Sequence, residues 1–324
     1  MGKNKDEKQM NQLITIIIPC FNEEQAIQHF VDEMSKIEKQ FEATNFEYIF
    51  INDGSTDNTL PVLKELSKVN EKYHYLSFSR NFGKEAALYA GLQHSTGDYV
   101  TVMDVDLQDP PSLLPKMYQL ITEEKYDCVG TRRVSRKGEP KIRSFFARQF
   151  YRVINRISDV EIVDGARDYR LMTRQMVDAI LEVKEYNRFS KGIFSWVGFD
   201  TYYLEFENVE RTDGETSWSF WSLFKYSLDG IVAFSEFPLV FSAFVGLFSF
   251  VGAIIALIFI IIRALVYGDP TSGWPSLVCI ILALGGLQLL CLGVVGQYLG
   301  KTFLETKRRP IYIIKESSKV NKDN

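Results

Sequence analysis

Residues 99–111 decide the fold, and they read Tyr99-Val100-Thr101-Val102-Met103-Asp104-Val105-Asp106-Leu107-Gln108-Asp109-Pro110-Pro111. An apolar run of strand length is followed at once by carboxylates, which predicts a buried strand ending in an acidic pair. Hard divalent cations such as Mg²⁺ and Mn²⁺ prefer carboxylate and carbonyl oxygens, and Mg²⁺ leaves other positions to water and substrate phosphates. The stretch therefore predicts a metal site for a diphosphate. The alternative is a solvated acidic turn before a helix that starts with proline.

Other apolar runs of strand length cover residues 13–19, 46–51, 73–78 and 126–130, and helical patterns alternate with them. This alternation predicts a mostly parallel α/β sheet with right-handed crossovers. In such sheets ligands sit at the carboxyl ends of the strands, where the polar motifs of this chain fall. We also expect Asn22 to be the N-cap of the helix that follows the first strand.

Four motifs resemble those of the family 2 glycosyltransferases with the GT-A fold. They are Pro19-x-x-Asn22-Glu23, Asp53-Gly54-Ser55-x-Asp57, Arg80-Asn81-x-Gly83 and Met103-Asp104-x-Asp106-Leu107-Gln108-Asp109-Pro110-Pro111. The last string is similar to the branch that glycosylates polyisoprenyl phosphates, which includes dolichol-phosphate mannose synthase and bacterial undecaprenyl-phosphate glucosyl- and N-acetylglucosaminyltransferases. The resemblance implies an inverting transfer of a sugar from a nucleoside diphosphate sugar to a lipid phosphate.

The predicted metal ligands lie in the acidic motif. Asp106 is the first candidate and Gln108 the second, which the resemblance also favours, while Asp104 either shares the metal or holds the ribose and a metal-bound water. A Mg²⁺ or Mn²⁺ ion there would neutralise the charge that grows on the leaving diphosphate.

The resemblance also implies a nucleotide shelf formed by Pro19, Asn22, Glu23 and Asp53, in which Asp53 accepts a hydrogen bond from the base. The alternative for residues 53–56 is a plain turn and helix cap.

Arg132 follows the fifth strand, and we expect its planar guanidinium to bind phosphate. The basic residues after it are expected only to attract lipid headgroups by their charge. They are Arg133, Arg136, Lys137, Lys141 and Arg143.

The segment 164–172 resembles a family segment that places Asp168 as the base or the acceptor-orienting carboxylate. Because a phosphate monoester has a second pKa of about 6, the acceptor needs little proton removal. Asp168 would then orient Arg170, which holds the acceptor phosphate; the alternative is a core salt bridge.

Arg211 opens the last motif, which continues to Ser219 and is also assigned to substrate binding. Mannosyl members of the family commonly carry Ser-Lys-Tyr where this chain has Thr216-Ser217-Trp218. This departure favours glucose or N-acetylglucosamine over mannose.

Two uncharged segments, at about residues 238–262 and 275–299, are long enough to cross a hydrocarbon core of about 30 Å at about 1.5 Å per residue. Basic residues are concentrated after the second segment, so both chain ends are expected in the cytoplasm and the protein in the plasma membrane as a multi-pass enzyme. Amphipathic patterns at residues 143–157 and 218–234 predict interfacial helices, or faces that pack on the sheet.

The predicted order is a polar tail over residues 1–12, a GT-A domain over 13–217, a juxtamembrane amphipathic helix over 218–237, two transmembrane helices within 238–300 and a basic cytoplasmic tail over 301–324.

The net charge of −4 argues against a nucleic-acid binder. The four cysteines lack metal-type spacing and are interpreted as reduced packing residues. The expected partners are a nucleotide sugar, a polyisoprenyl phosphate, the membrane and further copies of the chain in a homo-oligomer.

We therefore predict transfer of a hexose from UDP-glucose or UDP-N-acetylglucosamine to undecaprenyl phosphate, which makes a lipid-linked sugar donor for cell-envelope glycosylation. One alternative is a processive polysaccharide synthase, but two spans cannot enclose a polymer channel within one chain, and the sequence has no Gln-x-x-Arg-Trp segment. Another is a non-catalytic membrane scaffold or flippase partner on a transferase fold, against which the intact acidic motif, Arg132 and Asp168 argue.

Overall fold

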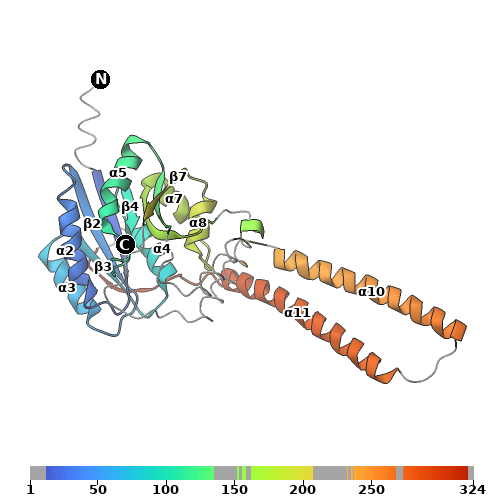
Figure 1. Cartoon of the computed structure of the whole chain (residues 1–324). Helices are drawn as coiled ribbons and strands as arrows, with labels where there is room; N and C mark the ends of the chain where they lie inside the picture. Colours follow the sequence, from blue (N-terminus) through green and yellow to red (C-terminus); the bar gives the residue numbers. More distant parts are fainter. Residues whose placement is uncertain are drawn as a thin grey trace.

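One mixed sheet organises the chain in this computed structural model, which describes residues 12–134, 152, 155–157, 162–206, 232, 235, 237–267 and 273–319. Within these residues the sheet has eight strands in the order β7-β5-β6-β4-β1-β2-β3-β8 (Figure 1). The strands are β1 Gln12–Cys20, β2 Thr44–Asn52, β3 Tyr73–Phe78, β4 Tyr99–Val102, β5 Cys128–Arg133, β6 Ala166–Thr173, β7 Thr201–Phe206 and β8 Ile314–Ser317.

Most of the sheet is parallel. β1 pairs in parallel with β2 and β4, β2 with β3, and β5 with β7. β6 is antiparallel to both β4 and β5, and β8 is antiparallel to β3. β1 to β5 and β7 therefore run in one direction, and their carboxyl ends share one edge of the sheet.

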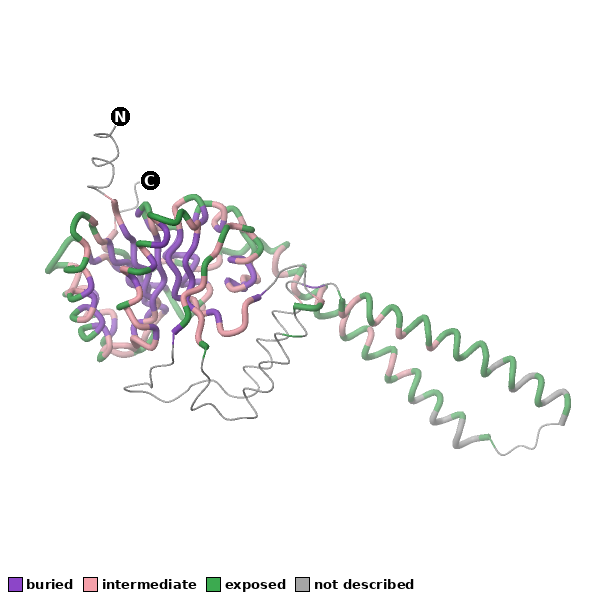
Figure 2. Tube along the Cα trace, turned by 45° about the horizontal axis from the view of Figure 1, so that its top comes forward, coloured by how far each residue is buried: buried purple, intermediate pink, exposed green. Residues whose placement is uncertain are grey.

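Helices cover both faces of the sheet. They are α2 Ala26–Glu38, α3 Thr59–Val69, α4 Lys84–His94, the short 3-10 helix η1 Pro111–Leu113, α5 Leu114–Glu123, α7 Arg174–Glu182 and α8 Ser190–Trp196. α2, α3 and α5 pack in one apolar cluster, and α4, α7 and α8 pack in the other. The buried strands lie between these helix layers (Figure 2).

Side chains alternate between the two faces of the sheet along each strand, and this alternation explains the two apolar clusters. Ile16 and Ile18 of β1 belong to the cluster with α2, whereas Ile17 between them belongs to the cluster with α4. Successive side chains of a strand point to opposite faces, so a fully apolar strand is buried on both sides. α4 lies so close to β1 that a Cβ on Gly91 would come within 2.2 Å of Ile17 Cγ2. The glycine thus allows α4 to sit directly on the sheet.

The five predicted strands are confirmed as β1 to β5, with small differences in their bounds. The prediction that Asn22 caps the first helix is wrong, because α2 begins at Ala26 with Gln25 at its N-cap position. Asn22 adopts a left-handed backbone with φ 57°, and its Oδ1 accepts a hydrogen bond of 2.9 Å from the Thr56 amide. The Asn22 side chain therefore joins two loops rather than ending a helix.

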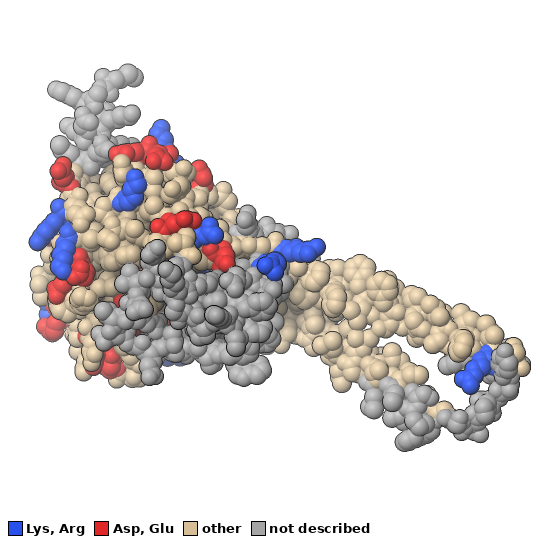
Figure 3. Space-filling model, viewed as in Figure 1, with Lys and Arg blue, Asp and Glu red and all other residues tan. Residues whose placement is uncertain are grey.

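Two long helices, α10 Phe237–Tyr267 and α11 Trp274–Thr306, extend together from the domain (Figure 1). Each contains a window, at Phe237–Ala256 and Ala283–Thr306, that is long and apolar enough to cross a membrane, and neither window is buried in the described chain. The charged side chains lie mainly on the globular part, while the two helices are almost bare of them (Figure 3). The residues of the two predicted interfacial helices, 143–157 and 218–234, lie mostly outside the described residues.

The chain returns to the sheet after α11. The sequence pattern predicts only a basic tail there, but β8 pairs with β3 in the register Leu76↔Ser317 and Ser77↔Glu316. The Tyr75 amide donates to Ser318 Oγ at 2.8 Å, and the Ser318 amide donates to the Tyr75 carbonyl at 3.1 Å. The segment after α11 is therefore an edge strand of the sheet.

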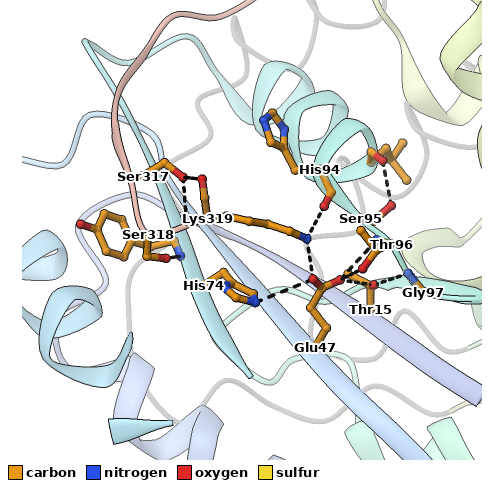
Figure 4. A network of polar contacts seen from close by, with 12 residues as sticks. Thr15, Glu47, His74, His94, Ser95, Thr96, Gly97, Ser317, Ser318 and Lys319 are labelled. Atoms are coloured by element: carbon orange, nitrogen blue, oxygen red, sulfur yellow. Dashed lines mark hydrogen bonds and ion pairs between the residues drawn. The ribbon is translucent and has the colours of Figure 1, made fainter. Parts of the chain in front are cut away.

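A buried carboxylate anchors the end of this segment (Figure 4). Glu47 of β2, 7% exposed, accepts hydrogen bonds from Lys319 Nζ, from Thr15 Oγ1 at 2.6 Å and from Thr96 Oγ1 at 3.1 Å. Lys319 Nζ also donates to the His94 carbonyl at 2.6 Å. Burial alone would raise the pKa of Glu47, but the bonds from Lys319 and Thr15 outweigh it and hold that pKa below its usual range.

Candidate active site

The acidic motif forms a tight turn directly after β4. Leu107 has a φ of 54°, and the Leu107 amide donates to the Asp104 carbonyl at 3.4 Å. Asp106 Oδ1 accepts a hydrogen bond of 3.2 Å from the Gln108 amide. Asp104, Asp106 and Gln108 are all partly exposed. The turn thus presents the three predicted metal ligands at the carboxyl edge of the sheet.

Lys84 connects this turn to Asp168 on β6. Its Nζ lies 2.8 Å from Asp104 Oδ1 and 2.9 Å from Asp168 Oδ2. Asp168 faces Asp104 because β6 begins at the edge where β4 ends. Burial alone would raise the pKa of Asp168, but the positive charges of Lys84, Lys191 and Arg170 outweigh it and hold that pKa well below its usual range. These charges therefore favour the ionised form of Asp168 at neutral pH.

Among the described residues the ion pair of Asp168 is made with Lys84, while Arg170, the partner predicted from the sequence, acts on the same carboxylate through its positive charge. Arg170 is 2% exposed, stacks on the Phe194 ring at 3.8 Å and donates from Nη2 to the Arg167 carbonyl at 3.0 Å. Arg170 acts on the site through its charge, which lowers the pKa of Asp168.

Asp109, the last acid of the motif, has a different environment from Asp106. Its side chain is 3% exposed and pairs with Arg167 Nε at 2.8 Å. Burial raises the pKa of Asp109 despite the opposing charge of Arg167. This buried pair links the acidic turn to β6, so Asp109 holds the turn in place.

Asp53 lies at the end of β2, and its carboxylate is engaged by backbone. Oδ1 accepts from the Phe82 amide at 2.6 Å and Oδ2 accepts from the Gly83 amide at 2.9 Å. Burial raises the pKa of Asp53, against the effect of these two bonds. In this arrangement Asp53 fixes the loop that leads into α4, and only its remaining lone pairs face other partners.

The other residues of the predicted nucleotide shelf belong to two loops joined by hydrogen bonds. The Asn22 amide donates to Ser55 Oγ at 3.0 Å, and the Glu23 amide donates to Thr59 Oγ1 at 2.8 Å. Pro19, near the end of β1, pairs with Ile51 of β2. The alternative role of Ser55 and Thr56 as helix caps does not hold, because α3 begins at Thr59 with Asn58 at its N-cap position.

Arg132 lies on β5 at the same edge of the sheet. Its Nε donates to the Asp164 carbonyl at 3.1 Å, and its Nη1 lies 3.8 Å from Glu205 Oε1. The side chain is 42% exposed, so it remains accessible to a phosphate. Arg211 and the whole basic run after Arg133 lie outside the described residues.

The donor set fits a hard divalent cation. Among the residues that the structure describes, no three His, Cys, Asp or Glu side chains converge as a closed cage. A Mg²⁺-type site does not need one, because one or two carboxylates and the substrate phosphates are sufficient. Asp106 supplies a carboxylate and Gln108 an amide oxygen in the same turn, and Asp104 supplies a second carboxylate.

Sequence reasoning missed the role of Lys84. The available signal was its position directly after Gly83, at the end of the polar motif that follows β3. Gly83 has a φ of 95°, and Lys84 is the first residue of α4. A cation at this strand end lies near the other motifs because parallel strand ends share one edge.

Comparison with known proteins gives consistent matches. The profile of glycosyl transferase family 2 matches residues 15–181. A Bacillus subtilis (strain 168) protein named as a glycosyltransferase, CsbB, is 44% identical over 313 residues, covering 96% of this chain and 94% of the relative. The bactoprenol glucosyl transferase of Shigella phage SfX is 40% identical over 302 residues, covering 93% of this chain and 98% of the relative.

A solved structure is also similar. It is glucosyl-3-phosphoglycerate synthase from Mycobacterium tuberculosis in complex with Mn²⁺, UDP-glucose and phosphoglyceric acid. The TM-score is 0.44 at 19% identity, and the match covers 68% of this chain and 78% of that chain.

Proposed function

The chain belongs to glycosyl transferase family 2, and we propose that it transfers glucose from UDP-glucose to the phosphate of bactoprenol, the bacterial undecaprenyl lipid. The observation that carries the proposal is the near full-length similarity, at 40% identity, to a relative named bactoprenol glucosyl transferase. The carboxyl-edge site with Asp104, Asp106, Asp168 and Lys84 agrees with this activity. The two apolar helices agree with an acceptor that is dissolved in a membrane.

In the proposed donor site, Asp106 and Gln108 would hold Mg²⁺ or Mn²⁺, with Asp104 as a further ligand. A metal bound there would supply positive charge against the leaving diphosphate. Pro19, Asn22, Glu23 and Asp53 surround the nucleoside. Arg132 supplies a guanidinium for the phosphates.

The proposed reaction is an inverting displacement. An oxygen of the acceptor phosphate attacks the anomeric carbon of glucose, a new carbon–oxygen bond forms there, and the bond to the UDP oxygen breaks with its electron pair leaving on UDP. The acceptor phosphate is largely a dianion at neutral pH because its second pKa is about 6. Asp168 therefore serves to position Lys84 and the acceptor rather than to remove a proton.

The proposed orientation places the catalytic domain in the cytoplasm at the plasma membrane. Lys301, Lys307, Arg308 and Arg309 lie at the domain end of α11, while Arg263 is the corresponding charge near the far end of α10. Positive residues are enriched on the cytoplasmic side of membrane helices. β8 follows α11 and pairs with the catalytic sheet, which requires the domain and the end of α11 to share one side of the membrane.

The test uses the full-length protein in lipid nanodiscs that contain undecaprenyl phosphate. Radiolabelled UDP-glucose, UDP-N-acetylglucosamine and GDP-mannose are offered separately, and the lipid products are separated by chromatography. We expect one glucose per lipid, and no product when undecaprenyl phosphate is omitted. Transfer of another sugar would refute the proposed donor, a polymeric product would indicate a processive synthase, and no transfer from any donor would refute the activity.

A further inference from the structure

The segment 183–190 connects the membrane helix α11 to the active site. It follows α7, contacts the domain end of α11 through Tyr186 and Asn187, and enters α8 at Ser190, which contacts the first turn of α4. Two carboxylates, Glu305 and Glu85, hold its two ends. Neither residue belongs to the site predicted from the sequence.

Glu305, in the last turn of α11, holds the first end. Its Oε2 accepts from the Tyr186 amide at 3.0 Å, and its Oε1 accepts from the Asn187 amide at 3.0 Å and from Asn187 Nδ2 at 2.9 Å. Charge-assisted hydrogen bonds to a carboxylate are the stronger class in proteins. The domain end of the membrane hairpin is therefore fixed to this segment by three such bonds.

Glu85 holds the second end. Its Oε2 accepts both the amide of Ser190, at 3.0 Å, and the Ser190 hydroxyl. Between the two ends, the Arg188 guanidinium lies over the Tyr89 ring of α4 at 4.3 Å and donates to the Val183 carbonyl. The segment is thus attached to the first two turns of α4 as well as to α11.

The residue before Glu85 is Lys84, whose ammonium lies between Asp104 and Asp168. Both residues belong to the first turn of α4, so a displacement of that turn would move Lys84 relative to the two carboxylates. A misplacement of about 1 Å at a reacting centre can cost about 100-fold in rate. The described contacts therefore form one connected path from the membrane helix to the proposed reaction centre.

We propose that segment 183–190 is a strut through which the membrane hairpin positions Lys84 between Asp104 and Asp168, with Glu305 and Glu85 as positioning residues for sugar transfer to a membrane lipid. This inference rests on the proposed function. It assigns the hairpin a role beyond anchoring, because the depth of α11 in the bilayer then sets the geometry of the site that receives the lipid phosphate.

The first measurement is steady-state transfer by the full-length protein in nanodiscs. We expect Glu305→Ala and Ser190→Ala each to lower kcat about 10-fold or more, with the affinity for UDP unchanged. Because both changes break the same strut, the kcat of the double variant should be no lower than that of the less active single variant. Glu85→Ala should behave in the same way, whereas Glu85→Gln should retain activity, since one carbonyl oxygen can accept both Ser190 donors.

Glu182→Ala is the matched control. Glu182 is exposed and lines the same groove of about 670 Å³ as Glu305, but it lies on α7. Its loss should leave kcat near the wild-type value. If Glu305→Ala fails to insert, Asn187→Ala removes only the side-chain bonds to α11 and tests the same end.

The second measurement does not depend on activity. Hydrogen exchange followed by mass spectrometry should show that Glu305→Ala accelerates exchange in α8 and in the first turn of α4, with α2 unchanged. Acceleration confined to residues 186 and 187, or a multiplicative effect of the two single variants on kcat, would overturn the strut. Absence of any transfer by the wild-type protein would instead refute the proposed function. The exchange measurement would still test whether Glu305 stabilises α8 and the first turn of α4.

Discussion

Lys84 Nζ and Asp168 Oδ2 form an ion pair of 2.9 Å between the first turn of α4 and the middle of the candidate site. This contact favours an orienting role of Asp168 over a general-base role. A general base works best when its pKa lies near the operating pH. The pKa of Asp168 is held well below its usual range by Lys84, Lys191 and Arg170 against the effect of burial, so the carboxylate is a weak base.

Replacing Asp168 by Asn should therefore lower kcat by a factor that stays constant from about pH 5.5 to 8.5, because an orienting carboxylate is ionised throughout that range. The KM for the lipid phosphate should rise at the same time. pH–rate profiles of both proteins at saturating and limiting acceptor measure this. Recovery of the variant at high pH with an unchanged KM would identify Asp168 as a general base.

Asp106 and Asp109 allow a matched test of the metal site. Asp106→Asn should lower turnover about 100-fold or more, because loss of charge stabilisation at the leaving group costs several kcal/mol. It should also weaken Mn²⁺ binding measured by electron paramagnetic resonance in the presence of UDP. Asp109→Asn breaks the buried pair with Arg167 and should lower Tm while Mn²⁺ affinity persists. Full wild-type turnover in EDTA would contradict the metal assignment.

Membrane topology can be tested with reporter fusions. A reporter fused after Asn324 should report the cytoplasm, because β8 returns to the catalytic sheet. A reporter inserted at Gly268, between α10 and α11, should report the opposite side. Cytoplasmic signals from both positions would mean that the hairpin does not cross the membrane.

Lys319→Ala should destabilise the domain at pH 7, because it leaves Glu47 buried without its cation. The expected loss is about 1.5–3 kcal/mol, from hydrogen bonds to a charged group. Since the pKa of Glu47 is lowered by folding, its stabilising contribution is complete above its unfolded pKa of about 4.3 and is lost as the pH falls through the lower folded value. The Tm difference from wild type should therefore shrink below about pH 4.

Lys315→Ala is the control for that measurement, because Lys315 is an exposed residue of β8. Its replacement should change Tm little. Equal Tm losses for the two variants would show that the Lys319–Glu47 ion pair stabilises the domain no more than an exposed lysine does.

The sequence predicted the central sheet because β1 to β5 are apolar runs bounded by polar motifs, and such runs are informative by themselves. It did not predict β6, whose residues 167–170 include three charged side chains, or β8, which reads Ile-Lys-Glu-Ser. β8 becomes a strand only through its pairing with β3, more than two hundred residues earlier in the chain. Pairing over such a separation leaves no local periodicity to detect.

The site shows the same division. The positions of Asp104, Asp106 and Gln108 at the carboxyl edge follow from the end of β4, which the alternation of strands and helices predicts. Asp168 lies on β6, which that alternation does not predict, so only the resemblance to the family indicated its place in the site. The partner of Asp168 could not be predicted, because Lys84 and Arg170 are both near it and only side-chain geometry distinguishes them. The hydrogen bonds of Asp53 with the amides of residues 82 and 83, rather than with a nucleobase, likewise depend on loop packing that the sequence does not reveal.

The return of β8 to the sheet also orders the biogenesis of the protein. Ribosomes make the chain from its N-terminus, so the partner of the β3 edge is synthesised after both long helices. Until then β3 presents unpaired backbone groups, which is the kind of edge that invites aggregation. Completion of the sheet therefore waits for the synthesis of both long helices, and a chain that ends before β8 keeps an open edge that chaperones and proteases can recognise.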